Sequence, residues 1–203
     1  INAMIFFNDD GQTFNHWCHF MGSNLIIRTM EIGLFAGLLL HIVQGLLLWK
    51  QNRAARAIKY KMYNQSTSST WYSRSMGLLG TLILLFLVLH LYHFWVPSRF
   101  GGMANVQALE STTLADYANQ ETHNLYKEMI VVFENIWVVI IYVLGVISLC
   151  WHLIHGFQSA FQTLGINHKK YTPIIKAVGF AFSIIICLVF AAMPISLYMG
   201  WVN

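Results

Sequence analysis

Four long apolar stretches without a charged side chain dominate the hydrophobic pattern of the chain. They cover residues 32–49, 75–98, 135–168 and 177–203. Because a helix needs about 20 apolar residues to cross a bilayer, each stretch predicts a membrane span, the first only if it begins before Glu31. The stretches lack the alternating pattern of barrel strands. We therefore predict an all-α transmembrane helical bundle, one domain over residues 1–203, with spans at about residues 25–49, 74–97, 130–164 and 173–200.

Prolines mark the ends of some predicted spans. Pro97 fits just beyond the second span, and Thr172 with Pro173 fits the first turn of the fourth. Pro194 lies inside the fourth span and is expected to kink it.

The segments outside the spans predict smaller elements. Residues 1–7 resemble the end of an apolar helix leaving the membrane, so we expect an earlier helix before Ile1 and five spans in total. Residues 13–20 predict a short interfacial helix with aromatic side chains on one face. Residues 101–126 are polar with scattered apolar positions, which predicts a loop with a short helix.

Composition agrees with this pattern. Of the 203 residues, 57% are hydrophobic and only 10% are charged, and the mean hydropathy is +0.55. Globular domains average about 25% charged residues, so a soluble, disordered or nucleic-acid-binding protein is excluded. The three cysteines share no metal-like or disulfide-like spacing.

The charges predict the orientation of the bundle. Nine of the twelve Lys and Arg residues lie in the connection 50–74 or at residues 169–176, whereas all eight acidic residues lie on or near the other side. By the positive-inside rule the basic side is cytoplasmic. Its charge could hold anionic lipid or dock an acidic partner.

Histidines inside the predicted spans are the candidate chemistry. His41 lies in the first span, His90 and His93 in the second, and His152 and His155 in the third. A single histidine could simply bond a neighbouring helix. Several imidazoles on separate helices, without an acidic residue in mid-membrane, favour haem iron with axial histidine ligands.

Depth along the helices separates these histidines into two levels. At 1.5 Å per residue, His41 lies roughly 13 Å before Lys50, and His152 lies roughly 27 Å inward from Glu134. We therefore expect His41 and His152 to pair toward the cytoplasmic side. His90 lies in the outer half, where the expected upstream helix would supply its partner.

Several motifs resemble a known family. The residues are 41–45 (HIVQG), 71–74 (WYSR), 86–91 (FLVLHL), 152–156 (HLIHG) and 161–165 (FQTLG). They are similar to the cytochrome b membrane subunit of succinate dehydrogenase and fumarate reductase, in its single-subunit, five-helix, dihaem form found in Bacteroidetes-like bacteria. The resemblance covers nearly the whole chain.

The resemblance implies two b haems and the residues that hold them. His41 and His152 would ligate the inner haem and His90 the outer one. His155 and His93, each three residues further on, are the alternatives, with His93 and Trp95 read as an interfacial pair. Some relatives carry an acidic residue two positions before the third-span ligand. This chain has Cys150 there, so a proton path through that position is not expected.

The resemblance also implies an assembly. A flavoprotein with FAD and an iron–sulfur subunit would dock at the cytoplasmic face of the bacterial inner membrane, and quinone, in particular menaquinone, would react near the outer haem. We expect Glu31 to assist proton transfer there, unless it is only an interfacial carboxylate. Four residues could hold the haem propionates, or could simply anchor the helices at the membrane interface: Arg28, Arg74, Trp71 and Tyr72.

Two other interpretations stay open. The membrane subunit of a hydrogenase or a formate dehydrogenase would also bind two haems through such histidines, but would assemble with other partner subunits. A haem-free transporter or assembly factor would use the histidines only for packing.

Overall fold

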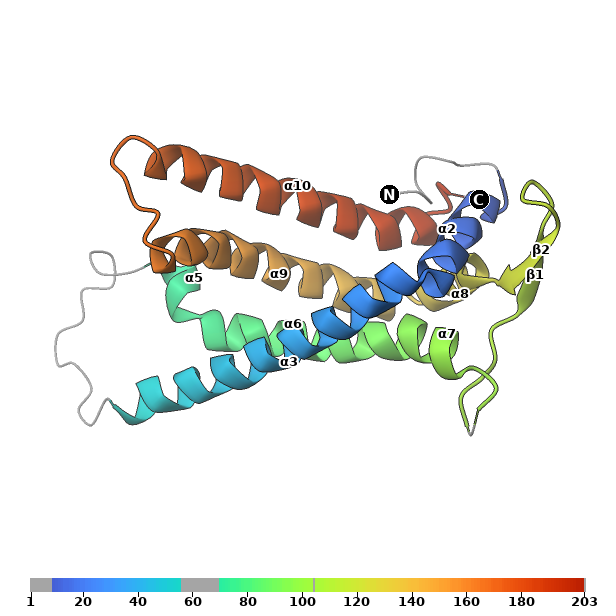
Figure 1. Cartoon of the computed structure of the whole chain (residues 1–203), viewed down its shortest axis with the longest axis horizontal. Coiled ribbons are helices and arrows are strands. Elements are labelled where there is room, and N and C mark those ends of the chain that lie inside the picture. Colours follow the sequence, from blue (N-terminus) through green and yellow to red (C-terminus); the bar gives the residue numbers. More distant parts are fainter. Residues whose placement is uncertain (1–8, 56–69, 104, 203) are drawn as a thin grey trace.

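The computed structural model describes residues 9–55, 70–103 and 105–202, and four helices in these ranges are long and apolar enough to cross a membrane. The four-span all-α bundle predicted from the sequence is confirmed (Figure 1). Along the chain the helices are α2 (Gln12–Ser23), α3 (Leu25–Ala54), α5 (Trp71–Arg74), α6 (Met76–His90), η1 (Leu91–Trp95), α7 (Val96–Phe100), α8 (Leu125–Phe133), α9 (Ile136–Thr163) and α10 (Thr172–Tyr198).

Helix α9 is the centre of the bundle. It packs against both α6 and α10, and 28% of its apolar window is buried, more than in the other three spans. Close packing depends on glycine: a Cβ at Gly145 would lie 2.6 Å from the ring of Phe86, and one at Gly179 would overlap the ring of Phe157. The apolar core lies at one end of the bundle, where α8 meets the start of α9 and the chain end after α10.

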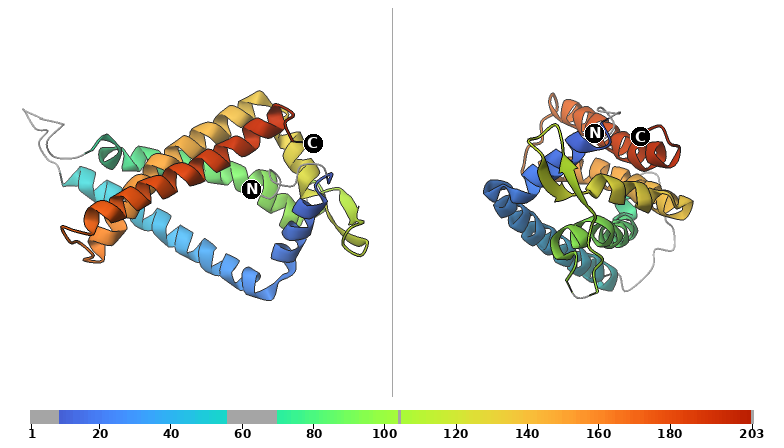
Figure 2. Two further views of the ribbon diagram at one scale, coloured as in Figure 1. Left: turned by 90° about the horizontal axis from the view of Figure 1, so that it is seen from above. Right: turned by 90° about the vertical axis from the view of Figure 1, so that its right-hand side faces the viewer.

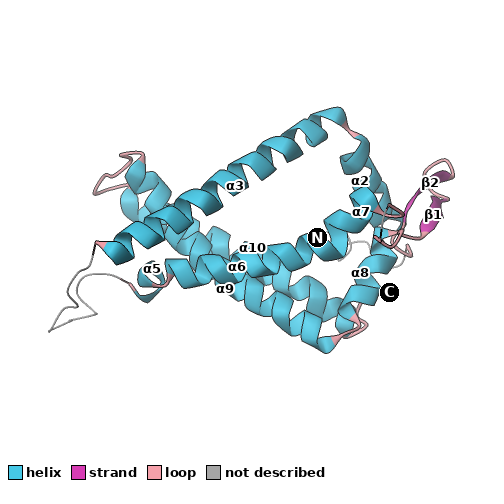
Figure 3. Ribbon diagram, turned by 90° about the horizontal axis from the view of Figure 1, so that it is seen from below, coloured by secondary structure: helices cyan, strands magenta, loops and turns pink. Residues whose placement is uncertain are grey.

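Helix α3 stands apart from the other three spans. It crosses the bundle at an angle and has no buried residue (Figures 2 and 3). It contacts the second span near its two ends, through Phe35 and Trp95 (ring centroids 5.1 Å apart) and through Trp49 against Gly77. The apolar surface between these two contacts is exposed on α3.

The second span differs from its predicted end. It does not stop before Pro97 but passes through the π-helical turn η1 and continues as α7 to Phe100. Pro97 is tolerated because it lies in the first turn of α7, where a missing N–H costs little. The π turn shifts the helix register locally, as insertions of this kind do.

The ends of the third and fourth spans also differ slightly from prediction. The third starts only at Ile136, because α8 ends at Phe133 and Asn135 caps α9, its side chain accepting a hydrogen bond of 2.9 Å from the Trp137 N–H. An asparagine at this position satisfies an otherwise unpaired helix N–H. The fourth begins at Thr172, one residue earlier than expected.

The segment 101–126 is not the loop with a short helix that the sequence suggested. It forms an antiparallel hairpin of β1 (Ser111–Leu114) and β2 (Gln120–His123), with Ser111 paired to His123. The turn uses positive φ at Ala118 and Asn119. Since the strands are only four residues long, period-two patterning is too brief to reveal them in the sequence.

The hairpin is held against α2, and α2 confirms the short helix predicted over residues 13–20. Asn15 of α2, only 1% exposed, donates a 3.0 Å hydrogen bond to the Asn124 side chain and accepts one of 3.0 Å from the Tyr126 N–H. His16 stacks on Tyr117 with ring centroids 3.8 Å apart. Helix α2, the hairpin and α8 therefore form a cap on one end of the bundle (Figure 1).

The two ends of the bundle differ in charge as the sequence predicted. The hairpin end carries acidic side chains such as Glu110, Asp116 and Glu121, and the α9–α10 connection at the opposite end carries Lys169 and Lys170 (Figure 1). The expectation of a further helix before Ile1 falls on residues 1–8, which lie outside the described residues, as does most of the basic connection 56–69.

Candidate functional site

The structure brings His41 of α3 and His152 of α9 together. Their ring centroids are 6.0 Å apart and the ring planes meet at 86°. Residues 111 positions apart in the chain thus face each other from two helices. The level estimated from the sequence for these two histidines agrees with this geometry.

An apolar pocket of about 320 Å³ opens beside this pair. Its lining is shared by α3, α9 and α10: His41, His152, Leu153, Gly156, Phe157 and Phe182. Nδ1 of His152 is buried there without a hydrogen-bond partner among the described residues. A buried imidazole nitrogen left unpaired is costly, so it needs a ligand, a proton acceptor or a donor.

Glycines leave space around the pair. A Cβ added at Gly37, Gly45 or Gly156 would meet no atom of the described residues within 4 Å. Gly37 and Gly45 flank His41 by one helical turn on each side, and Gly156 follows His152 by one turn. A flat ligand can therefore approach the backbone of both helices at the level of the two imidazoles.

The second span presents two histidines with different surroundings. His93 shares a 3.0 Å hydrogen bond between its Nδ1 and the hydroxyl of buried Tyr142, and the two rings are stacked. His90 is exposed and lies near the rings of Phe86, Phe94 and Tyr142, with no hydrogen bond to its imidazole within the described part of the chain. His93 is thus engaged in helix packing, whereas His90 is free to bind a ligand.

His93 and Trp95, read from the sequence as an interfacial pair, each bind a side chain of another helix. His93 points to Tyr142 of α9, and the indole N–H of Trp95 donates a 2.6 Å hydrogen bond to Glu31 of α3. Neither contact was predicted from the sequence, because both depend on which helices become neighbours.

His155 belongs to an aromatic cluster rather than to the His41 and His152 pair. Tyr72 stacks on Trp151 and lies edge-on to His155, with ring centroids 5.5 and 6.3 Å apart, and Trp71 packs edge-on to Trp151 at 5.8 Å. The short helix α5, which carries Trp71 and Arg74, therefore packs beside α9 at the level of Trp151 and His155, and both side chains are exposed.

Glu31 and Arg28 form a separate cluster in the N-terminal part of α3. The Glu31 carboxylate pairs with Arg28 at 3.0 Å and with Arg99 of α7 at 3.1 Å, and its other oxygen accepts the Trp95 bond. Arg28 precedes His41 by 13 residues, which is roughly 20 Å along a helix. Arg28 is therefore not brought to the His41 and His152 pair.

A second pocket, of about 460 Å³, adjoins this cluster under the cap. Glu31 and Arg99 form part of its wall, together with Cys18, His19 and His123. Burial raises the pKa of the Cys18 thiol to about 11, so this cysteine is protonated near neutral pH. Neither His19 nor His123 was a candidate from the sequence, because both lie outside the spans.

Comparison of the chain with protein-family models, with curated proteins and with solved structures found no match in any of the three.

Proposed function

We propose that the protein is the haem b-binding membrane subunit of a succinate:quinone oxidoreductase in a bacterial inner membrane. It would pass electrons between an iron–sulfur subunit on the cytoplasmic side and a quinone, such as menaquinone, in the membrane. Succinate and fumarate would be interconverted by a flavoprotein partner that carries FAD, so this chain would not itself act on succinate.

The single observation that carries the proposal is the pairing of His41 and His152 inside the membrane. Metal–imidazole bonds of about 2 Å on each side of one metal atom, plus the radius of each ring, require ring centroids about 6 Å apart, close to the 6.0 Å between these two rings. The unpaired Nδ1 of His152 and the open glycines beside both histidines fit a flat iron porphyrin. His41 and His152 would be its two axial ligands.

A second haem would use His90. Its exposure in mid-membrane favours a ligand role, since an imidazole facing lipid without a partner is unfavourable. Haem iron held by two histidines carries one electron at a time and has no open position for oxygen. The protein's own part is to hold the groups at two depths and to exclude water with apolar walls such as Phe86 and Phe94.

The charge distribution supports the placing of the partners. Lys169 and Lys170, next to the start of α10, are exposed at the same end of the bundle as the aromatic cluster of Trp71 and Trp151. A basic, aromatic-rich rim suits an acidic subunit docking at this face.

The test is a haem assay on single histidine variants of the full-length protein purified with its partners. We expect a b-type reduced-minus-oxidised spectrum and two haems per chain. H41A and H152A should each remove about one haem, and H90A should remove the other. H155A and H93A are the matched controls, each three residues away on the same helix, and should keep both.

A colourless wild-type preparation would contradict the proposal. So would loss of haem in H155A with retention in H152A, which would reverse the ligand assignment. Co-purification of a hydrogenase or formate dehydrogenase in place of a flavin-containing subunit would move the protein to another dihaem complex.

A further inference from the structure

Two cysteines meet at the interface between α9 and α10. The thiol of Cys150 on α9 donates to the main-chain carbonyl of Ser183 on α10, at 3.9 Å. Cys187 follows Ser183 by one helical turn on the same face, and its side chain hydrogen-bonds that of Cys150. The interface therefore holds two thiols in contact, one from each helix.

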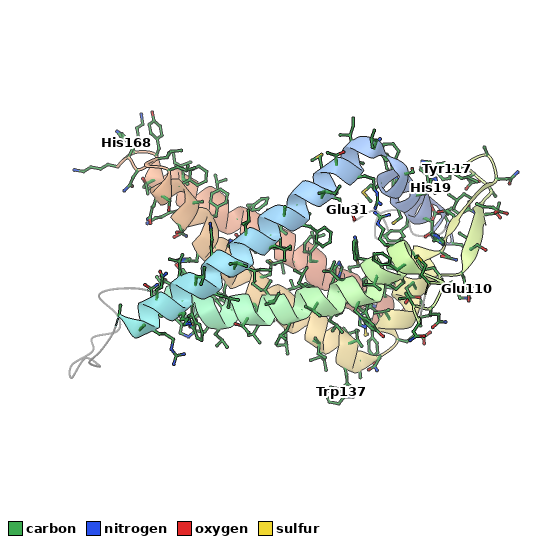
Figure 4. The ribbon with its side chains drawn as sticks, turned by 60° about the horizontal axis from the view of Figure 1, so that its bottom comes forward. His19, Glu31, Glu110, Tyr117, Trp137 and His168 are labelled. Carbon is green, nitrogen blue, oxygen red and sulfur yellow. The ribbon has the colours of Figure 1, made fainter. Side chains whose placement is uncertain are left out.

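This dithiol, formed by Cys150 and Cys187, lies far from both ends of the bundle. Figure 4 labels Trp137 at the start of α9 and His168 just before α10, and these two residues mark the ends. Cys150 follows Trp137 by 13 residues, about 20 Å along the helix. The dithiol is therefore expected in the middle of the membrane, where water is scarce.

The hydroxyl groups near the dithiol are bound within their own helices. The Ser183 hydroxyl, fully buried, donates to the carbonyl of Gly179 at 2.7 Å. The Ser148 hydroxyl donates to the carbonyl of Leu144 at 3.0 Å. No acidic residue follows Glu134 in the sequence. The two thiols are therefore the nucleophilic groups of this interface among the described residues, and no carboxylate accompanies them.

The dithiol is enclosed by the two helices but can be reached from the lipid. Cys187 is only 6% exposed, whereas Cys150 is half-buried. Ile147, one turn before Cys150, and Leu188, next to Cys187, are both exposed on the surface of the helices. A ligand dissolved in the lipid can therefore approach the dithiol at Cys150, whereas a hydrated ion cannot.

The apolar surroundings restrict the ligand to one that gives a neutral product. A charged product is costly inside the membrane unless a counter-charge lies close by. Zinc takes four ligands, so two thiols do not complete its site. Trivalent arsenic that carries one organic group binds two sulfur atoms and gives a neutral product. An apolar trivalent organoarsenical therefore fits the dithiol in ligand number, in charge and in route of entry.

We infer that Cys150 and Cys187 form a binding site for lipid-soluble trivalent organoarsenicals. One molecule of the form R–As=O reacts with both thiols: two S–H bonds and the As=O bond break, and two As–S bonds form. The oxygen leaves as water with the two thiol hydrogens, and arsenic and sulfur keep their oxidation states. The product links α9 to α10 through one arsenic atom.

This site is separate from the proposed haem site. Cys150 faces α10, whereas His152, two residues further and about 200° around the helix, faces His41 of α3. Linking the two thiols should therefore leave a group held by His41 and His152 in place. The dithiol does not depend on the proposed function.

Binding is tested with phenylarsine oxide, a neutral trivalent organoarsenical, on the full-length protein purified with its partners. The treated sample is washed with an excess of a monothiol, which removes arsenic held by one sulfur but not by two. Intact-mass spectrometry of this chain should then show one phenylarsenic group per molecule. A dithiol such as dimercaptopropanol should release it.

The three cysteines of the chain supply matched variants. C150S and C187S should each reduce the retained arsenic at least tenfold, because the remaining thiol cannot hold it alone. C18S should retain as much arsenic as the wild type, since Cys18 lies in α2 at the end of the bundle. Thermal unfolding of the untreated variants checks their folding, and C150A and C187A repeat the test if a serine variant unfolds early.

Arsenic retained in C150S or C187S would overturn the inference, as would a wild-type protein that releases all of its arsenic to the monothiol. A disulfide between Cys150 and Cys187 in freshly purified protein, seen as a mass lower by two hydrogen atoms, would also overturn it, because no free dithiol would then exist. A colourless protein that still retains one arsenic per chain would contradict the proposed function alone.

Discussion

At the scale of single residues, Tyr142 distinguishes two histidines that the sequence alone could not separate. His90 and His93 lie three positions apart, hence on similar faces of one helix. Only His93 reaches the buried Tyr142 hydroxyl, at 3.0 Å. His90 can therefore act as a ligand. Its preference over His93, which rested on its depth along the span, now has a structural reason.

Removing the Tyr142 hydroxyl should leave His93 without its partner. We expect Y142F to lower the free energy of unfolding by about 1 to 2 kcal/mol, the usual cost of a lost buried hydrogen bond. Thermal unfolding in detergent measures this, with Y92F as a control because Tyr92 is 67% exposed. Equal effects in both variants would mean that the His93 bond contributes nothing.

The Cys18 thiol should react slowly with alkylating reagents. Its pKa of about 11 against an ordinary 9.0 reduces the thiolate fraction at pH 8 about 100-fold. Iodoacetamide labelling followed by peptide mass spectrometry should show a rate that rises steeply from pH 8 toward pH 11. The same cysteine in the denatured protein is the control, and equal rates at pH 8 would contradict the burial of this thiol.

At the scale of elements, helix contacts depend on residues that look unremarkable in the sequence. Glycine in an apolar span predicts tight packing only in general. The structure shows that Gly145 lies under Phe86, whereas Gly33 faces open space. Glycine is therefore required for close packing at position 145 of α9, whereas Gly33 of α3 can be replaced by a larger residue.

This difference predicts opposite effects of one substitution. G145A should destabilise the α6 and α9 packing by about 1 to 3 kcal/mol, because the methyl group has no room beside the Phe86 ring. G33A should be neutral or stabilise by up to about 1 kcal/mol, since alanine favours the helix. Melting temperatures in detergent compare them, and a tolerant G145A would show that Phe86 moves easily.

The contact between α3 and α7 can be measured with a double-mutant cycle. We expect a coupling of about 1 kcal/mol between E31Q and R99Q, because this pair joins two helices and is partly buried. Arg28 is the matched control: its side chain is 43% exposed and lies on the same helix as Glu31, so its coupling should be smaller. Zero coupling with Arg99 would mean that the ion pair does not hold α3.

At the scale of the whole molecule, the orientation follows from charge asymmetry between the two ends. Cysteines introduced at Asn167 and Asp116 should be labelled by a membrane-impermeant maleimide from opposite sides. In intact spheroplasts only the variant at Asp116 should react, because the acidic end is expected to face outward. Labelling of the variant at Asn167 instead would invert the topology.

The sequence by itself determined the number of spans and the all-α class, because a run of about 20 apolar residues is stable across lipid as a helix. It also determined the level of His41 and His152, since helical rise is constant. Helix ends, the hairpin and the partners of His93 and Glu31 were decided only by the tertiary structure. These depend on which helices meet and on short-range capping, and residues such as Tyr142 and Trp95 acquire their roles only through neighbours distant in the chain.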